Sequence, residues 1–122
     1  MMKLVFLDAA TMGDDLDLGV FSQFGSLEIF DNTLPEEVIS RIRDVDIVLV
    51  NKVKIDKTSM DMATNLKLIC VAATGMDIID LEHAREKGIQ VMNVAGYSTD
   101  SVAQTTFLHI LSCMQYGGYF NT

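Results

Sequence analysis

The chain has 122 residues, which suits a single domain, because domains of about 100 to 150 residues can bury a self-sufficient core. Apolar residues make up 49% of it and the mean hydropathy is +0.27, yet no apolar run approaches the roughly 20 residues that span a membrane. The formal charge of −8 and isoelectric point near 4.4 argue against nucleic acid and anionic membranes as partners.

The N-terminus and the cysteines predict a cytoplasmic protein. Only four consecutive apolar residues, 4–7, precede Asp8, whereas a signal peptide has an apolar core of about 7 to 15 residues. Cys70 lies in a strand-like run and Cys113 in a helical one. Both are expected to be reduced thiols packed in the core.

Short apolar runs alternate with segments of helical periodicity, a pattern typical of a parallel α/β sheet. The predicted strands are Leu4–Leu7, Leu27–Phe30, Ile47–Val50, Leu68–Ala72 and Ile89–Met92. A parallel strand that is covered on both faces is continuously apolar, so the runs interrupted by Glu28 and Gln90 belong at the edges. We therefore expect a flavodoxin-like five-stranded sheet of order 2-1-3-4-5 with helices on both faces.

Start and stop signals for helices lie between these strands. The run from Thr33 to Glu36 resembles a capping box with proline in the first turn, ahead of a helix that reaches Ile42. Asp80 precedes a helix over 81–87, and Gly88 is placed to end it. A weaker helix is predicted over 57–63.

Three acidic residues, Asp14, Asp15 and Asp17, lie between the first two strands. The simpler interpretation is that they cap a short helix that runs through Phe21 to Phe24. A metal site is the alternative, but no loop here has the organised oxygen-ligand spacing of a calcium-binding loop. We therefore predict no metal site.

The last segment predicts a four-turn amphipathic helix. Thr99, Asp100 and Ser101 offer N-cap groups, and Gly117 and Gly118 end the helix. Its apolar residues, Ala103, Phe107, Ile110, Leu111 and Met114, follow helical spacing, and other apolar residues lie off that stripe. We expect a protruding C-terminal helix that packs against a neighbour.

Familiar catalytic motifs are absent from the sequence. The eight glycines form neither a dinucleotide-binding fingerprint nor a phosphate-binding P-loop. His83 is expected on the surface of a charged helix and His109 in a packed or interface position, and neither has a nearby partner in a known catalytic arrangement. No catalytic residue is assigned.

Two loops follow neighbouring central strands at their carboxyl ends, which is where open α/β sheets bind ligands. One is Asn51–Lys54 and the other is Ala73–Asp77. Backbone N–H groups of Ala73, Thr74 and Gly75 are suited to hold an anion, with Gly75 free to adopt a positive φ. The competing interpretation is an ordinary tight turn beside solvated lysines.

Several segments resemble the NAD-dependent D-isomer-specific 2-hydroxyacid dehydrogenases, most closely their glycerate dehydrogenase or hydroxypyruvate reductase group. The resemblance runs from Lys3 to about Leu111 and is carried by four segments: Val50–Val53, Asn65–Ile69, Ala72–Gly75 and Asn93–Gln104. Two departures are Ile78, where an Asn is common, and Thr105, where this group often has His.

The resemblance implies that the chain contains parts of two domains with different functions. Residues 1–97 would form the substrate-binding domain, and 98–122 the first helix of a truncated nucleotide-binding domain that also helps form a homodimer. The residues implied to contact a small 2-hydroxy or 2-keto acid are Asn51, Lys52, Ala73, Thr74 and Gly75, while Thr99 would contact NAD.

In the family, the catalytic Arg, Glu and His and the glycine fingerprint follow the matched region. The 122 residues alone are therefore expected to be inactive. The alternative is a stand-alone flavodoxin-like module that binds small carboxylates, or another protein, without catalysis.

Overall fold

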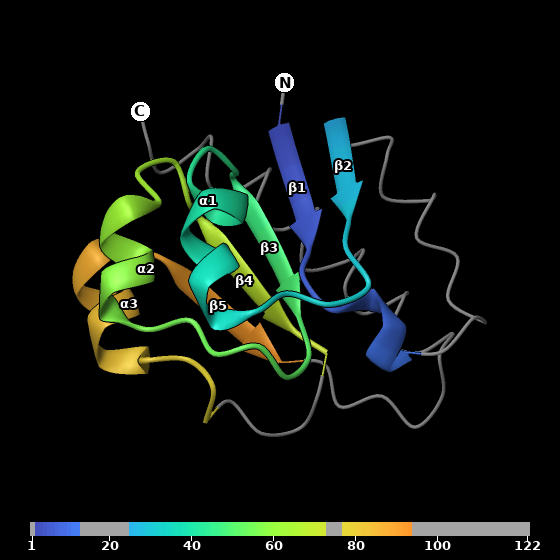
Figure 1. Ribbon diagram of the computed structural model, residues 1–122. Coiled ribbons are helices and arrows are strands. Elements are labelled where there is room, and N and C mark those ends of the chain that lie inside the picture. The colour runs from blue at the N-terminus through green and yellow to red at the C-terminus, as the bar shows by residue number, and fades with distance from the viewer. Residues whose placement is uncertain (1, 13–24, 73–76, 94–122) are drawn as a thin grey trace.

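The structure is a computed structural model that describes residues 2–12, 25–72 and 77–93. At its centre lies a five-stranded, all-parallel sheet of order β2-β1-β3-β4-β5 (Figure 1). Its strands are β1 (Met2–Phe6), β2 (Gly25–Ile29), β3 (Ile47–Val50), β4 (Leu68–Val71) and β5 (Gln90–Asn93). The predicted strand order is confirmed, and the two strands with interrupted apolar runs lie at the edges.

The position of each strand agrees with its burial. Every residue of β3 and β4 is buried, whereas β2 and β5 are partly exposed, with Ile29 of β2 at 48% exposure. The first two strands begin two residues earlier than their apolar runs, because Met2 pairs with Gly25 and Lys3 with Ser26 in the β1–β2 ladder. Backbone pairing therefore continues beyond the buried residues.

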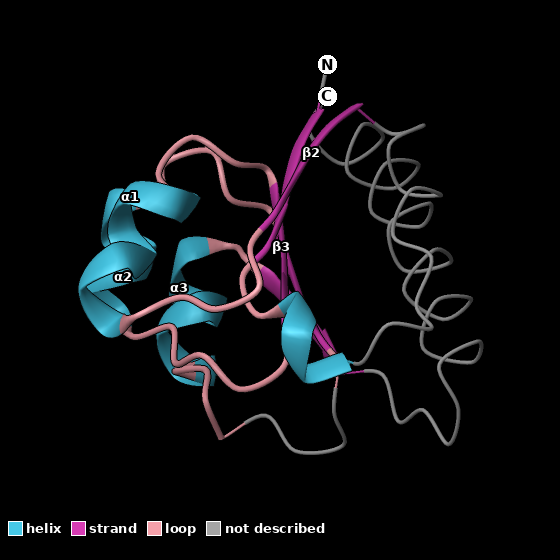
Figure 2. Cartoon of the chain, turned by 45° about the vertical axis from the view of Figure 1, so that its right-hand side comes forward, coloured by secondary structure: helices cyan, strands magenta, loops and turns pink. Residues whose placement is uncertain are grey.

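The described α-helices all lie on one face of the sheet, as Figure 2 shows, while the 3-10 helix η1 (Ala9–Met12) follows β1 at the carboxyl end of the sheet. The α-helices are α1 (Val38–Ile42), which continues from the 3-10 helix η3 (Pro35–Glu37), α2 (Lys57–Met62) and α3 (Leu81–Lys87). Their apolar side chains pack on that face of the strands in one core that includes Val48, Ile69 and Met60. In the described ranges, no helix is long and apolar enough to cross a membrane.

The opposite face of the sheet is buried as well. It carries a second cluster that includes Leu4, Phe6, Ile47 and Leu68. Cys70 belongs to this cluster at 1% exposure, as expected of a thiol in the core. The short helix predicted through Phe21 to Phe24 and the predicted protruding C-terminal helix lie outside the described residues, as does Cys113.

Two of the predicted helix signals are confirmed at α3. The Asp80 carboxylate accepts a hydrogen bond from the His83 backbone N–H at 3.1 Å, and Gly88 adopts a left-handed conformation with φ of 77°. An L side chain would be strained at that φ, so glycine suits the end of the helix.

The predicted cap of the segment before α1 is wrong in its residues. Leu34, not Thr33, is the N-cap of η3, and its backbone N–H donates to the Glu37 side chain at 3.0 Å. The Thr33 hydroxyl instead donates to the Leu7 carbonyl at 2.6 Å. The buried Leu7 carbonyl, directly after β1, needs a hydrogen-bond donor. The Thr33 hydroxyl is that donor, so it is not available to cap the helix as its position in the sequence suggested.

The helix α2 is capped by a residue that the sequence analysis did not single out. Asp56 accepts from the Ser59 backbone N–H at 2.9 Å and from the Ser59 hydroxyl at 3.0 Å. The hydrogen bond from the Ser59 backbone N–H holds the pKa of the Asp56 carboxyl below its usual value, and the hydrogen bond from the Ser59 hydroxyl lowers it further.

We expect Asp56→Ala to lower the free energy of unfolding by about 1 kcal/mol near neutral pH, as is usual for loss of an N-cap. Because the pKa of Asp56 is lower in the folded state, its contribution is present above the pKa of the unfolded chain and is lost as the pH falls through the folded pKa. Urea titrations at several pH values should show the two proteins converging in acid. A constant difference down to the lowest pH would contradict this.

Candidate functional site

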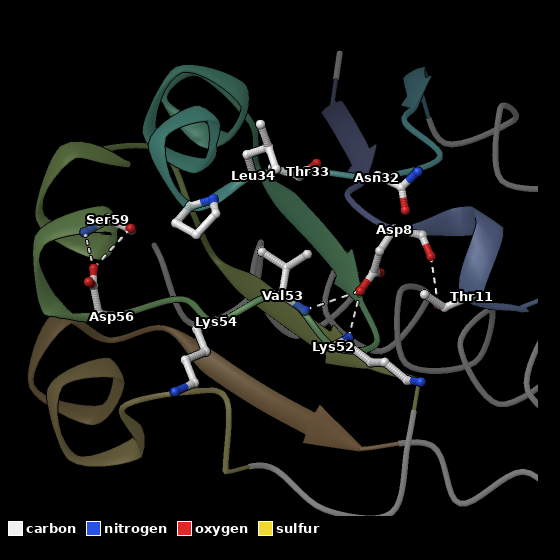
Figure 3. Close-up of a pocket in the computed structure, with 11 residues that line it drawn as sticks. Asp8, Thr11, Asn32, Thr33, Leu34, Lys52, Val53, Lys54, Asp56 and Ser59 are labelled. Atoms are coloured by element: carbon white, nitrogen blue, oxygen red, sulfur yellow. Dashed lines mark hydrogen bonds between the residues drawn. The ribbon is translucent and has the colours of Figure 1, made fainter.

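An open cleft of about 740 Å³ lies at the carboxyl ends of β1 and β3, where ligands bind in sheets of this type (Figure 3). The turn after β1, the segment between β2 and α1, the loop after β3 and the start of α2 all contribute to it. Its lining residues are Asp8, Thr11, Asn32, Thr33, Leu34, Pro35, Lys52, Val53, Lys54, Asp56 and Ser59.

One wall of the cleft is organised around the carboxylate of Asp8, which is only 2% exposed. One of its oxygens accepts from the Asn51 backbone N–H at 2.8 Å. The other accepts from the N–H groups of Lys52 at 2.6 Å and Val53 at 3.1 Å. Successive backbone N–H groups that converge in this way form an anion-binding nest, and here the bound anion is the chain's own side chain.

The side chains of this loop differ in what they can offer a ligand. The Asn51 amide donates to the Thr11 hydroxyl at 2.9 Å, and that hydroxyl donates to the Asp8 carbonyl at 2.7 Å. Among the described ion pairs, none includes Lys52 or Lys54. Positive charge at the cleft is therefore available from the two lysines, while Asn51 is engaged with the neighbouring turn.

The opposite wall, Asn32 to Leu34, is held by Arg41 of α1. The guanidinium donates to the Asn32 carbonyl and to the Thr33 hydroxyl, both at 2.7 Å. It also pairs with Glu37 at 2.9 Å and lies 3.9 Å from the centre of the Phe30 ring. Several contacts on one side chain fix this wall, since a planar guanidinium can donate and stack at once.

The structure brings together two of the residues that the sequence analysis proposed for the substrate. Lys52 lines the cleft, and Asn51 lies beside it in the same loop. Ala73, Thr74, Gly75 and Thr99 lie outside the described residues.

The chain on both sides of 73–76 is nevertheless fastened next to the loop after β3. Ala72 donates its backbone N–H to Val50 at 2.7 Å, and Ile55 donates to Ile78 at 2.8 Å. Ile55 also forms a parallel bridge with Ile79. The described ends of the two predicted loops are therefore neighbours, as the strand order implies.

Asp8, Thr11 and Thr33 were missed as site residues. Asp8 could have been predicted from the sequence, because it directly follows the apolar run 4–7 of a central strand. The carboxyl ends of parallel strands share one edge of the sheet, which is where ligands bind. For Thr33 no such signal existed, since its partner at Leu7 lies 26 residues earlier.

His83 lies in a cluster of charged residues between α2 and α3, and its side chain is only 11% exposed. His83 lies on the charged helix α3, as expected, and Asp61 of α2, 22 residues away in the sequence, approaches its Nε2 at 2.7 Å while Glu86 approaches Nδ1 at 3.6 Å. The hydrogen bond from His83 holds the pKa of Asp61 below its usual value. His109 lies outside the described residues.

Comparisons with known proteins identify the family of the chain. The family described as D-isomer specific 2-hydroxyacid dehydrogenase, catalytic domain, matches residues 5–121. A hydroxypyruvate reductase of Blautia hydrogenotrophica is 36% identical over 98% of this chain and 38% of its own length. A glycerate dehydrogenase of Methylorubrum extorquens is 32% identical over 92% of this chain and 34% of its own length.

Solved structures share the fold. The NAD⁺-bound 3-phosphoglycerate dehydrogenase of Entamoeba histolytica has a TM-score of 0.68 and 30% identity, over 76% of this chain and 32% of that one. The chain thus spans between about a third and two fifths of the length of these relatives. On the match of residues 5–121, the chain belongs to the D-isomer-specific 2-hydroxyacid dehydrogenase family, within the region described as its catalytic domain.

Proposed function

We propose that this chain is the substrate-binding part of an NAD-dependent oxidoreductase that interconverts small D-2-hydroxy acids and 2-keto acids, such as glycerate and hydroxypyruvate. One observation carries the proposal beyond family membership. A chain of net charge −8 places Lys52 and Lys54, outside any described ion pair, at a cleft on the carboxyl edge of its sheet. Local positive charge of this kind attracts a small carboxylate.

In this proposal the substrate carboxylate meets the Lys52 ammonium on one side of the cleft. Asn51 contributes to the same wall, and the backbone N–H groups of Ala73, Thr74 and Gly75 complete the anion site. The Asn51–Val53 backbone donors are not part of that site, because the Asp8 carboxylate already occupies them.

The described residues do not fit the cofactor. The turn after β1 is Leu7–Ala10 and contains no glycine, so it lacks the close backbone approach that a dinucleotide pyrophosphate requires. NAD would therefore be bound outside the described residues, with Thr99 as the proposed contact. The homodimer stays a proposal too, and involves the segment 98–122.

The proposal predicts that the 122 residues bind D-glycerate but do not oxidise NADH in the presence of hydroxypyruvate or glyoxylate. Binding should appear in amide NMR spectra as shifts at residues 51–54. Lys52→Met should weaken it about tenfold, since a charge-assisted contact of this kind is worth more than 1 kcal/mol.

Lys67→Met is the matched control, because Lys67 precedes β4 at the other end of the sheet. Equal losses in the two variants, or no D-glycerate binding at all, would overturn the proposed site. Genuine turnover of NADH would overturn the claim that these residues bind without reacting.

A non-catalytic module is the second candidate, since the described cleft offers two lysines and no catalytic residue is assigned there. Reading the gene beyond Thr122 separates the two. A G-x-G-x-x-G motif after a predicted strand supports the dehydrogenase, and a stop codon supports the module.

A further inference from the structure

The loop after β3 is anchored by a group that belongs to a different strand. Asn51, Lys52 and Val53 follow β3, yet their backbone N–H groups all donate to Asp8 at the end of β1. Figure 3 shows the Asp8 carboxylate facing this loop from beside Thr11. A loop at the end of a strand is ordinarily free to change its backbone conformation, and three bonds to one buried carboxylate remove that freedom.

We propose that Asp8 is a positioning residue of the cleft, which fixes the backbone of Asn51–Val53 so that Lys52 meets the substrate carboxylate in one geometry. Asp8 does not contact the substrate in this scheme and acts through Lys52. The inference deepens the proposed function and rests on it.

The geometry favours positioning over direct binding. Both oxygens of Asp8 are already engaged by the loop, and a carboxylate would repel an anionic substrate. The shortest of the bonds, at 2.6 Å, is to the N–H of Lys52 itself. A displacement of about 1 Å in a binding group is enough to weaken its action strongly, so the backbone anchor bears directly on that lysine.

The chain supplies a matched control at the opposite end of the same strand pair. Asp46, just before β3, accepts the Lys3 backbone N–H of β1 at 2.8 Å. It therefore also joins β1 to β3 through a carboxylate, but at the amino end of the sheet and away from the cleft. Asp46→Asn should perturb the strand pair without affecting ligand binding.

The test is a double-mutant cycle in which amide NMR measures the affinity of the 122-residue chain for D-glycerate. We expect Asp8→Asn to weaken binding about tenfold, and to have no further effect when Lys52→Met is already present, because coupled residues are not additive. Asp46→Asn should bind as the wild type does. Loss of the same factor in both backgrounds would show that Asp8 acts without Lys52, and would overturn the proposal.

The other outcomes separate the two claims. If the wild type binds D-glycerate and Asp8→Asn binds it with the same affinity, the positioning role is overturned and the proposed function stands. No binding by the wild type overturns the proposed function, and the positioning role with it.

A measurement on the wild type covers the case in which Asp8→Asn fails to fold. The N–H groups of residues 51–53 should exchange with solvent at least tenfold more slowly than in an unstructured peptide, since their acceptor is buried. Exchange at the unstructured rate would overturn the anchor directly.

Discussion

Replacing Ile69 by alanine should lower the free energy of unfolding of the chain by about 3 kcal/mol, the usual cost of deleting a buried isoleucine side chain beyond Cβ. Ile69 lies in β4, pairs in register with Val48 and Val91, and has 0% exposure in the core between the sheet and its helices. The loss combines transfer of the side chain out of an apolar environment with the cavity left behind. Urea unfolding monitored by circular dichroism measures it.

Ile29→Ala is the matched control for this prediction. It is the same substitution in the same sheet, but Ile29 lies on the edge strand β2 and is 48% exposed. Its cost should be about 1 kcal/mol or less, because half of the side chain already contacts water. Equal effects at the two positions would mean that β4 is not the buried centre of the sheet.

Replacing Asp8 by asparagine should lower the free energy of unfolding by about 3 kcal/mol, since hydrogen bonds to charged groups contribute 1.5 to 3 kcal/mol and a buried unpaired donor is costly. An asparagine presents one oxygen and one NH₂ group where the carboxylate has two acceptors. At least one of the three backbone N–H groups then faces another donor.

Asp46→Asn again serves as the control, because its carboxylate accepts a single described backbone N–H, that of Lys3. We expect a cost of about 1 kcal/mol for it. Urea titrations of both variants give the comparison. A cost at Asp8 no larger than that at Asp46 would show that the three bonds do not stabilise the folded chain.

The strand order could be predicted because the burial of a strand determines which residue types it contains. Strands covered on both faces admit only apolar residues, as in Ile47–Val50, and polar residues such as Glu28 and Gln90 are tolerated where one side of a strand meets solvent. The ends of the strands were less predictable. They depend on which backbone groups find a partner, and the pairing of Met2 with Gly25 involves no apolar pattern.

The candidate site was predictable where it follows from a single strand end. Asn51 and Lys52 come directly after a buried strand, so their place at the carboxyl edge follows from the topology. Asp8 and Thr33 depend on contacts between segments 26 to 45 residues apart. Local spacing carries no information about such contacts, and for Thr33 it pointed to a helix cap instead.

The Asp8 anchor also ties the cleft to the order in which the chain can fold. Its bonds join residues 43 to 45 positions apart, across two strands whose pairing encloses all of β2 and α1. Closing so long a loop is entropically costly until β1 and β3 have paired. The lysine-bearing wall of the cleft therefore takes its final shape only once β1 and β3 have paired.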